Sequence, residues 1–179
     1  SGNGEPTAAP EFLNVLEVII DCLKEFSLID KIPIRLITNG SFISKKKECL
    51  NIINQHHGEI WFKIDAADKD SIKRINQVNL DPNSMINHLK ICAEACQTVI
   101  QTCFLKINHQ LPANDFLENY SRLIKPYEHI VKKIDLYSLA RPSLQNNQDI
   151  AIERLSLDEL NNIKSILEKE LTIKIDVFP

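Results

Sequence analysis

The hydrophobic positions of this chain follow two different spacings, one typical of helices and the other of strands. Residues 10–26 carry apolar side chains three and four positions apart, which predicts an amphipathic helix. Residues 32–37 are a short run rich in branched apolar side chains that ends at Thr38-Asn39-Gly40, the pattern of a buried strand followed by a turn. The same criteria predict further helices over residues 45–57, 68–76, 83–96, 112–125 and 156–167, and further strands over residues 60–65, 98–107, 130–137 and 171–177.

Specific residues mark where several of these elements begin and end. Pro10 suits the first turn of a helix, and the breaker Asp81-Pro82 separates two helices because proline lacks a backbone donor. Ser156 and Glu159 have the SxxE spacing of a capping box, which predicts a helix start. With these boundaries, helices and strands alternate along the chain.

This alternation predicts an α/β fold in which right-handed crossovers build a mainly parallel sheet covered by helices. A barrel and a doubly wound sheet both fit the order of elements. At 179 residues the chain has the size of one domain, so we expect residues 1–179 to form a single domain. In either architecture ligands bind at the carboxyl ends of the strands, where functional residues are therefore sought.

Composition narrows the class of protein without identifying it. Hydrophobic residues make up 44% of the chain and charged residues 25%, as in an ordinary globular domain. No run approaches about 18 apolar residues, so we expect no membrane span. The formal net charge of -3 gives no support for nucleic-acid binding. The five cysteines are an odd number, which argues against a disulfide framework and favours the reducing cytoplasm.

Polar residues gather at the predicted carboxyl ends of the strands. Thr38-Asn39-Gly40 follows one strand, Lys63 and Asp65 lie near the end of the next, and Tyr137 and Arg141 mark the exit of a later strand. Lys63 and Asp65 are two positions apart, so both side chains should point to the same face. A buried charged pair in this position serves a ligand more often than stability, and we expect the set to bind a small molecule.

The first 76 residues resemble a known superfamily. The segments Ser1-Gly2-Asn3-Gly4-Glu5-Pro6-Thr7, Thr38-Asn39-Gly40 and Phe62-Lys63-Ile64-Asp65-Ala66 are similar, in type and order, to motifs of the radical S-adenosylmethionine (radical SAM) enzymes. Residues 65–76 resemble a run found in an Fe-S oxidoreductase-like branch of that superfamily. The rest of the chain resembles the superfamily mainly in the order of its strands.

The resemblance implies a partial (β/α)6 barrel, TIM-like and truncated at its N-terminus. It implies S-adenosylmethionine and a 4Fe-4S cluster as cofactors of the full-length protein, which would reductively cleave S-adenosylmethionine to start radical chemistry on an unidentified substrate. The residues that would then contact the adenosyl cofactor are Gly4, Glu5, Pro6, Thr38, Asn39, Lys63 and Asp65. Tyr137 and Arg141 would be weaker contacts to substrate or cofactor.

One part of the superfamily pattern is absent from the chain. The cluster is held by a CxxxCxxC loop, whereas here Cys92 and Cys96 have only the first spacing and Val99 stands at the third position. We expect Cys92, Cys96 and Cys103 to be core residues, and the chain to bind no metal and to retain neither cofactor. The resemblance predicts that roughly 60 or more residues precede this chain in an active parent protein and that the chain alone is inactive.

Two other classes of function fit the same residues. Lys63 and Asp65 would suit a barrel lyase or aldolase in which the amine forms an imine or donates a proton. Alternatively, a degenerate barrel would serve as a non-catalytic interaction module. A truncated barrel would also expose an unpaired strand edge, which favours self-association.

Overall fold

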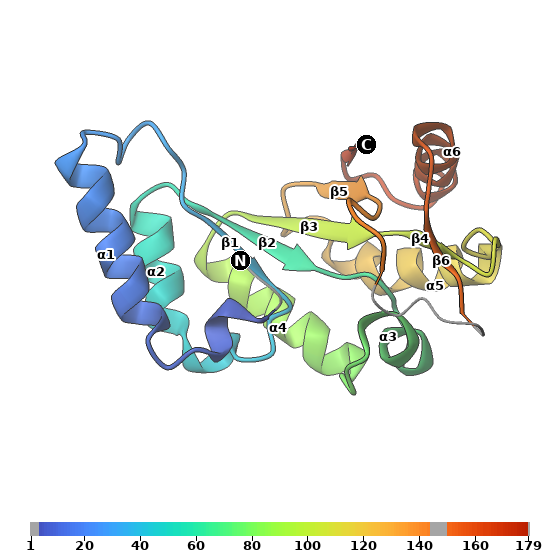
Figure 1. The fold of residues 1–179 in the computed structure, drawn as a ribbon, viewed down its shortest axis with the longest axis horizontal. Helices are drawn as coiled ribbons and strands as arrows, with labels where there is room; N and C mark the ends of the chain where they lie inside the picture. Colours follow the sequence, from blue (N-terminus) through green and yellow to red (C-terminus); the bar gives the residue numbers. More distant parts are fainter. Residues whose placement is uncertain (1–3, 144–149, 179) are drawn as a thin grey trace. The chain divides into compact units, whose positions relative to one another are not determined.

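The computed structural model describes residues 4–143 and 150–178, so Ser1, Gly2 and Asn3 of the N-terminal motif lie outside it. The helices are α1 (Phe12–Glu25), α2 (Lys47–Gln55), α3 (Lys69–Asn76), α4 (Pro82–Ala95), α5 (Asn114–Ile124) and α6 (Leu157–Leu167) (Figure 1). The strands are β1 (Arg35–Thr38), β2 (Glu59–Lys63), β3 (Thr98–Cys103), β4 (Leu105–Ile107), β5 (Ile134–Tyr137), β6 (Ile152–Arg154) and β7 (Ile175–Val177). Each predicted helix is confirmed. None of the helices in the described residues is long and apolar enough to cross a lipid bilayer.

The strands form a mainly parallel sheet, which confirms the predicted α/β fold. Five strands follow the order β1-β2-β3-β5-β7, and β1 with β2, β3 with β5, and β5 with β7 run parallel. Strands β4 and β6 form a separate antiparallel pair. Parallel neighbours need long connections, and the alternating helices supply them.

The prediction of one continuous strand over residues 98–107 is wrong. The chain leaves the sheet at Phe104, whose backbone N–H donates to the Tyr137 carbonyl while its side chain is only 1% exposed. Beyond it, β4 pairs with β6, a strand that the sequence did not predict. The apolar pattern runs through Phe104 without a break, so only the pairing of distant segments reveals where one strand ends and the next begins.

The chain divides into two compact units, each assembled from two stretches of sequence. Unit 1 comprises Ser1–Lys63 and Asn83–Val99, and unit 2 comprises Ile64–Pro82 and Ile100–Pro179.

In unit 1 the two faces of β2 differ as the alternating pattern predicts. Ile60 and Phe62 are fully buried, whereas Trp61 and Lys63 are half-buried on the opposite face. Helices α2 and α4 add buried residues to this core, among them Leu50, Ile53, Met85, Leu89 and Cys92.

Helix α1 departs from a simple amphipathic pattern. Leu16 and Ile20 are its buried residues, whereas Val15 is 51% exposed and Ile19 is 43% exposed. Phe26, the last apolar residue of the predicted stripe, is 70% exposed and follows the helix end. The apolar positions therefore extend around more of α1 than the face that the described residues bury.

The core of unit 2 is built around α5. Tyr120 is fully buried, and its hydroxyl lies 2.5 Å from Thr102 Oγ1, while its ring meets the Phe104 ring edge to face at 5.3 Å. Burial raises the pKa of Tyr120, so the phenol stays neutral. Helix α6 begins at the predicted capping box, in which the Ser156 side chain and the Glu159 side chain each bond the other residue's backbone N–H.

Candidate functional site

The Glu5 carboxylate is the centre of a hydrogen-bond cluster in unit 1. Its Oε1 accepts hydrogen bonds from Thr7 N (3.1 Å), Thr7 Oγ1 (2.5 Å) and Thr38 Oγ1 (2.6 Å), and its Oε2 accepts one from Asn39 N (2.8 Å). Thr7 and Thr38 are each 1% exposed, so these bonds form in a largely dry environment. The carboxylate therefore fixes the N-terminal segment against the end of β1, 33 residues away along the chain.

The predicted turn after β1 is confirmed, and each of its residues has a defined role. Thr38 Oγ1 accepts from Gly40 N at 3.0 Å, and Asn39 Oδ1 accepts from Ser41 N at 2.9 Å. Gly40 has a φ of +78°, the left-handed conformation that favours glycine. Asn39 Nδ2 forms no hydrogen bond with the residues that the structure describes.

A histidine that sequence reasoning missed stands behind this turn. A Cβ placed on Gly40 would lie 3.0 Å from the Cβ of His88 on α4. His88 Nδ1 is buried and has no hydrogen-bond partner among the described residues, and burial lowers the pKa of His88. A neutral imidazole therefore backs the turn. No spacing in the sequence signals this contact, because it depends on how α4 packs.

Two hydrogen bonds hold the Asp65 carboxylate within unit 2. It is 5% exposed, its Oδ1 accepts from Cys103 N at 2.8 Å, and its Oδ2 accepts from Asn76 Nδ2 at 2.7 Å. The carboxylate thus connects the segment after β2 with the end of β3 and the end of α3. The prediction that Asp65 is buried at a strand end is confirmed, and both of its oxygens have partners within the chain.

The other sequence-predicted residues fall in both units. Tyr137 ends β5 opposite Cys103 in the parallel register, so it lies near the backbone that holds Asp65. Arg141 is exposed beyond it in unit 2. Lys63, at the end of β2, belongs to unit 1 with Glu5, Thr38 and Asn39. The structure therefore brings Glu5 together with Thr38 and Asn39, whereas Asp65, Tyr137 and Arg141 belong to unit 2.

The cysteines do not form a metal centre. All five are free: Cys22 is exposed, Cys103 is half-buried, and Cys49, Cys92 and Cys96 are buried. Burial raises the pKa of Cys92 to about 12 and that of Cys96 to about 11, so both thiols stay protonated. Among residues 4–143 and 150–178, no group of three or more potential ligands is placed to hold a metal ion.

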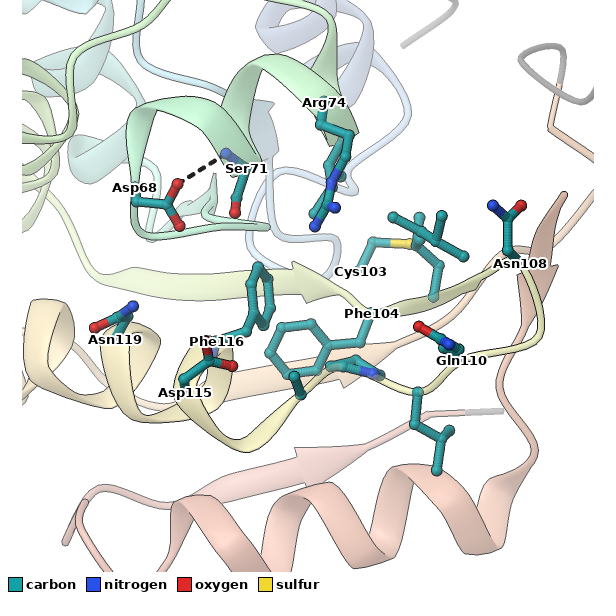
Figure 2. Close-up of a pocket in the computed structure, with 16 residues that line it drawn as sticks. Asp68, Ser71, Arg74, Cys103, Phe104, Asn108, Gln110, Asp115, Phe116 and Asn119 are labelled. Atoms are coloured by element: carbon teal, nitrogen blue, oxygen red, sulfur yellow. Dashed lines mark hydrogen bonds between the residues drawn. The ribbon is translucent and has the colours of Figure 1, made fainter. Parts of the chain in front are cut away.

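Unit 2 also contains a pocket of about 480 Å³ that the sequence did not indicate (Figure 2). Its walls come from one face of α3, the start of α5 and the segment from Cys103 to Ala113. Arg74, Phe116 and Gln110 line it. Arg74 falls within the run of residues 65–76, but no spacing in the sequence places these three side chains together.

Comparison with known proteins relates the fold to solved structures. No family model matches the chain, and no curated protein matches its sequence. A radical SAM methyltransferase from Sphaerobacter thermophilus matches with a TM-score of 0.68 and 14% identity, over 98% of this chain and 48% of that one. SuiB of Streptococcus suis matches with a TM-score of 0.66 and 16% identity, over 98% of this chain and 38% of that one. The chain shares the fold of part of these proteins and spans less than half of their length.

Proposed function

We propose that this chain forms the part of a radical SAM enzyme that holds S-adenosylmethionine. The observation that carries the proposal is the Glu5 carboxylate, which joins Gly4-Glu5-Pro6 to the turn at Thr38 and Asn39. The likeness in fold to a radical SAM methyltransferase supports this choice of cofactor. The motif suggests the ligand, and the fold is compatible with it.

In this proposal Glu5 is a positioning residue, and the backbone carbonyls around it contact the cofactor. Both carboxylate oxygens already accept hydrogen bonds from the chain, and the carbonyls of Glu5 and Pro6 each accept one from Ala8 N and Ala9 N. The methionine ammonium would therefore donate to the Gly4 carbonyl and to the second lone pairs of the other two carbonyls. Thr38 and Asn39 would lie near the methionine or the ribose. The Asn39 amide would donate a hydrogen bond there.

The remaining candidate residues are assigned to the ribose and the substrate. Lys63 and Asp65 would lie near the ribose or the substrate, and Tyr137 and Arg141 would be weaker contacts to either molecule. Because Asp65 holds the backbone at Cys103, it would also fix the end of β3. When bound beside a reduced cluster, S-adenosylmethionine supplies a radical that starts chemistry on the substrate.

The cysteines of this chain do not fit the 4Fe-4S cluster. Cys92 and Cys96 are buried as protonated thiols, and Cys103 lies at the end of a strand. A cluster with one open iron needs three convergent thiolates, so we propose that a CxxxCxxC segment outside these 179 residues provides them. The free cysteines favour the reducing cytoplasm as the location of the enzyme.

The test uses the full-length gene product, reconstituted anaerobically with iron and sulfide. We expect about four irons per chain and release of 5′-deoxyadenosine when S-adenosylmethionine and a strong reductant are added. Glu5→Gln should weaken S-adenosylmethionine binding by about tenfold or more, because the amide disturbs hydrogen bonds to a charged group. Glu25→Gln, at the exposed end of α1, is the matched control and should bind normally.

Absence of both bound iron and 5′-deoxyadenosine would overturn the proposal. Reduction with borohydride in the presence of keto substrates distinguishes the lysine-dependent lyase, because only an imine at Lys63 would leave a stable adduct.

A further inference from the structure

The pocket of unit 2 is a concave site with two helical walls and an apolar floor. Ser71 and Arg74 line it from α3, and Asp68 lines it from the position just before that helix. Asp115, Phe116 and Asn119 line it from α5. Its volume of about 480 Å³ falls within the range of sites that enclose small molecules. All its lining residues belong to unit 2, so the pocket is complete within one compact unit.

The floor of the pocket is aromatic and fixed in position. Phe104 is 1% exposed, and its ring meets the half-buried Phe116 ring at 6.0 Å and the buried Tyr120 ring at 5.3 Å. Both contacts are edge to face, the arrangement that aromatic quadrupoles favour. Phe116 therefore presents a supported aromatic surface to the pocket.

The polar side of the pocket provides one guanidinium group. Figure 2 shows Arg74 extending from α3 towards the segment that carries Cys103 and Phe104. Arg74 forms no ion pair with any residue that the structure describes. Its planar fork of donors matches a carboxylate or a phosphate better than any other common group.

The two carboxylates of the pocket are each bound by their own helix. Asp68 Oδ1 accepts from Ser71 N at 2.8 Å, and Asp115 Oδ1 accepts from Phe116 N at 2.9 Å. Both acids therefore serve the helix starts in addition to lining the pocket. Arg74 lies near Asp68 and contributes to lowering its pKa, but a single carboxylate leaves most of the five guanidinium donors free.

The loop at Asn108 and His109, at one end of the pocket, has an unusual backbone conformation and is held by several contacts. Asn108 and His109 have φ values of 51° and 65°, which are unusual for residues other than glycine. Two hydrogen bonds fix this loop, one from Asn108 N to Ala151 O and one from Ala151 N to Asn108 Oδ1, both at 2.8 Å. A hydrogen-bond contact between His109 Nδ1 and Glu153 at 3.0 Å adds a third contact at the surface. Strained and pinned loops of this kind are typical of binding sites formed in advance of the ligand.

We propose that this pocket binds small aromatic molecules that carry an oxyanion, a carboxylate or a phosphate. The ring packs against Phe116, and the oxyanion accepts hydrogen bonds from Arg74. The amides of Gln110 and Asn119 offer further hydrogen bonds to substituents on the ring. The proposal does not rest on the binding of S-adenosylmethionine.

The test is calorimetric titration of the chain with four probes: 1-naphthyl phosphate, 1-naphthoate, 1-naphthol and inorganic phosphate. We expect saturable binding of at least one naphthyl anion, and binding at least about tenfold weaker for 1-naphthol and for inorganic phosphate. The naphthyl anion that binds with the higher affinity shows whether the pocket prefers a phosphate or a carboxylate. Absence of saturable binding of both anions would overturn the proposal.

Variants assign the binding to this pocket. Arg74→Gln should weaken binding of the preferred anion about tenfold or more and leave 1-naphthol unchanged, and Phe116→Leu should weaken both by about threefold. Lys73→Gln, the exposed neighbour on α3, is the matched control and should have no effect. Equal loss in Arg74→Gln and Lys73→Gln would show a general charge effect and overturn the proposal.

A further titration, in the presence of S-adenosylmethionine, tests whether this pocket is distinct from the proposed cofactor site. Excess S-adenosylmethionine should leave the affinity of the naphthyl anion unchanged. Displacement of the probe would assign the pocket to the cofactor and overturn the inference, whereas failure of the full-length protein to bind iron would leave this result unaffected.

Discussion

At the scale of single residues, Gly40 combines two requirements that other residues meet poorly. Its φ of +78° is left-handed, and a Cβ at this position would lie 2.6 Å from Phe62 Cε2 and 2.7 Å from Phe62 Cζ. Phe62 is fully buried, so its ring has little space into which to move. The turn that carries Thr38 and Asn39 therefore depends on the absence of a side chain at Gly40.

We expect Gly40→Ala to lower the free energy of unfolding by about 2 kcal/mol or more, because it adds backbone strain and overpacking. Urea unfolding monitored by circular dichroism measures the change. Gly4→Ala is the control, because a Cβ at Gly4 meets nothing within 4 Å, and it should change stability by less than about 0.5 kcal/mol. Equal stability of the two variants would show that the turn accommodates a side chain.

The sequence indicates candidate residues but not the contacts that those residues make. Thr38 and Asn39 were predicted because a strand pattern ends there, and that signal is local. The role of Glu5 depends on partners 33 and 34 residues away, and Asp65 depends on Asn76 and Cys103. Such contacts arise only when the sheet assembles, and no spacing in the sequence reports them.

At the scale of elements, local sequence signals predict where helices begin. They do not predict a strand that depends on pairing with a distant segment. Asp68 caps α3 through its bond from Ser71 N, and the capping box at Ser156 begins α6, so both helix starts lie close to their predicted positions. Strand β6 has three residues and owes its form to the antiparallel register with β4. A strand so short carries too few positions for its periodicity to be recognised.

The cap of α3 should make stability depend on pH. Burial is the largest single influence and opposes ionisation of Asp68, but the hydrogen bonds from Ser71 and from the Asp70 backbone, together with the Arg74 charge, lower the pKa of this carboxyl below its usual value. A lowered pKa gives stability that is present above the unfolded value and is lost as the pH falls through the folded value. Asparagine caps helices about as well and does not titrate.

We therefore expect the stability of the natural protein, relative to Asp68→Asn, to fall between about pH 5 and about pH 2. Unfolding in urea at a series of pH values measures the difference. Asp21→Asn, on an exposed part of α1, is the control and should show little of this trend. A difference that stays constant over this range would mean that the ionised carboxylate contributes nothing to the cap.

At the scale of the whole molecule, the cysteines report how completely the chain is folded. Cys49, Cys92 and Cys96 are buried, and burial raises the pKa of all three thiols. Cys22 is exposed on α1, and Cys103 is half-buried at the end of β3. Only a thiolate in contact with solvent reacts quickly with an alkylating reagent.

We expect iodoacetamide to label Cys22 first in the native protein and to label Cys49, Cys92 and Cys96 on the order of a hundredfold more slowly. Peptide mass spectrometry at a series of times measures the rates, and all five cysteines should react at similar rates in guanidinium. Cys22→Ser should remove the fast label. Fast native labelling of Cys92 would contradict the burial described for α4.

The assembly of each compact unit from two stretches of sequence limits how the chain can vary by recombination. A single genetic crossover after residue 63 gives a unit 1 whose two stretches come from different parent genes. A crossover after residue 99 does the same to unit 2, and one after residue 82 does it to both units. Exchange of one intact core between related genes needs breakpoints at all three places. Gradual amino-acid replacement is therefore an easier route to diversity for these two cores than gene shuffling.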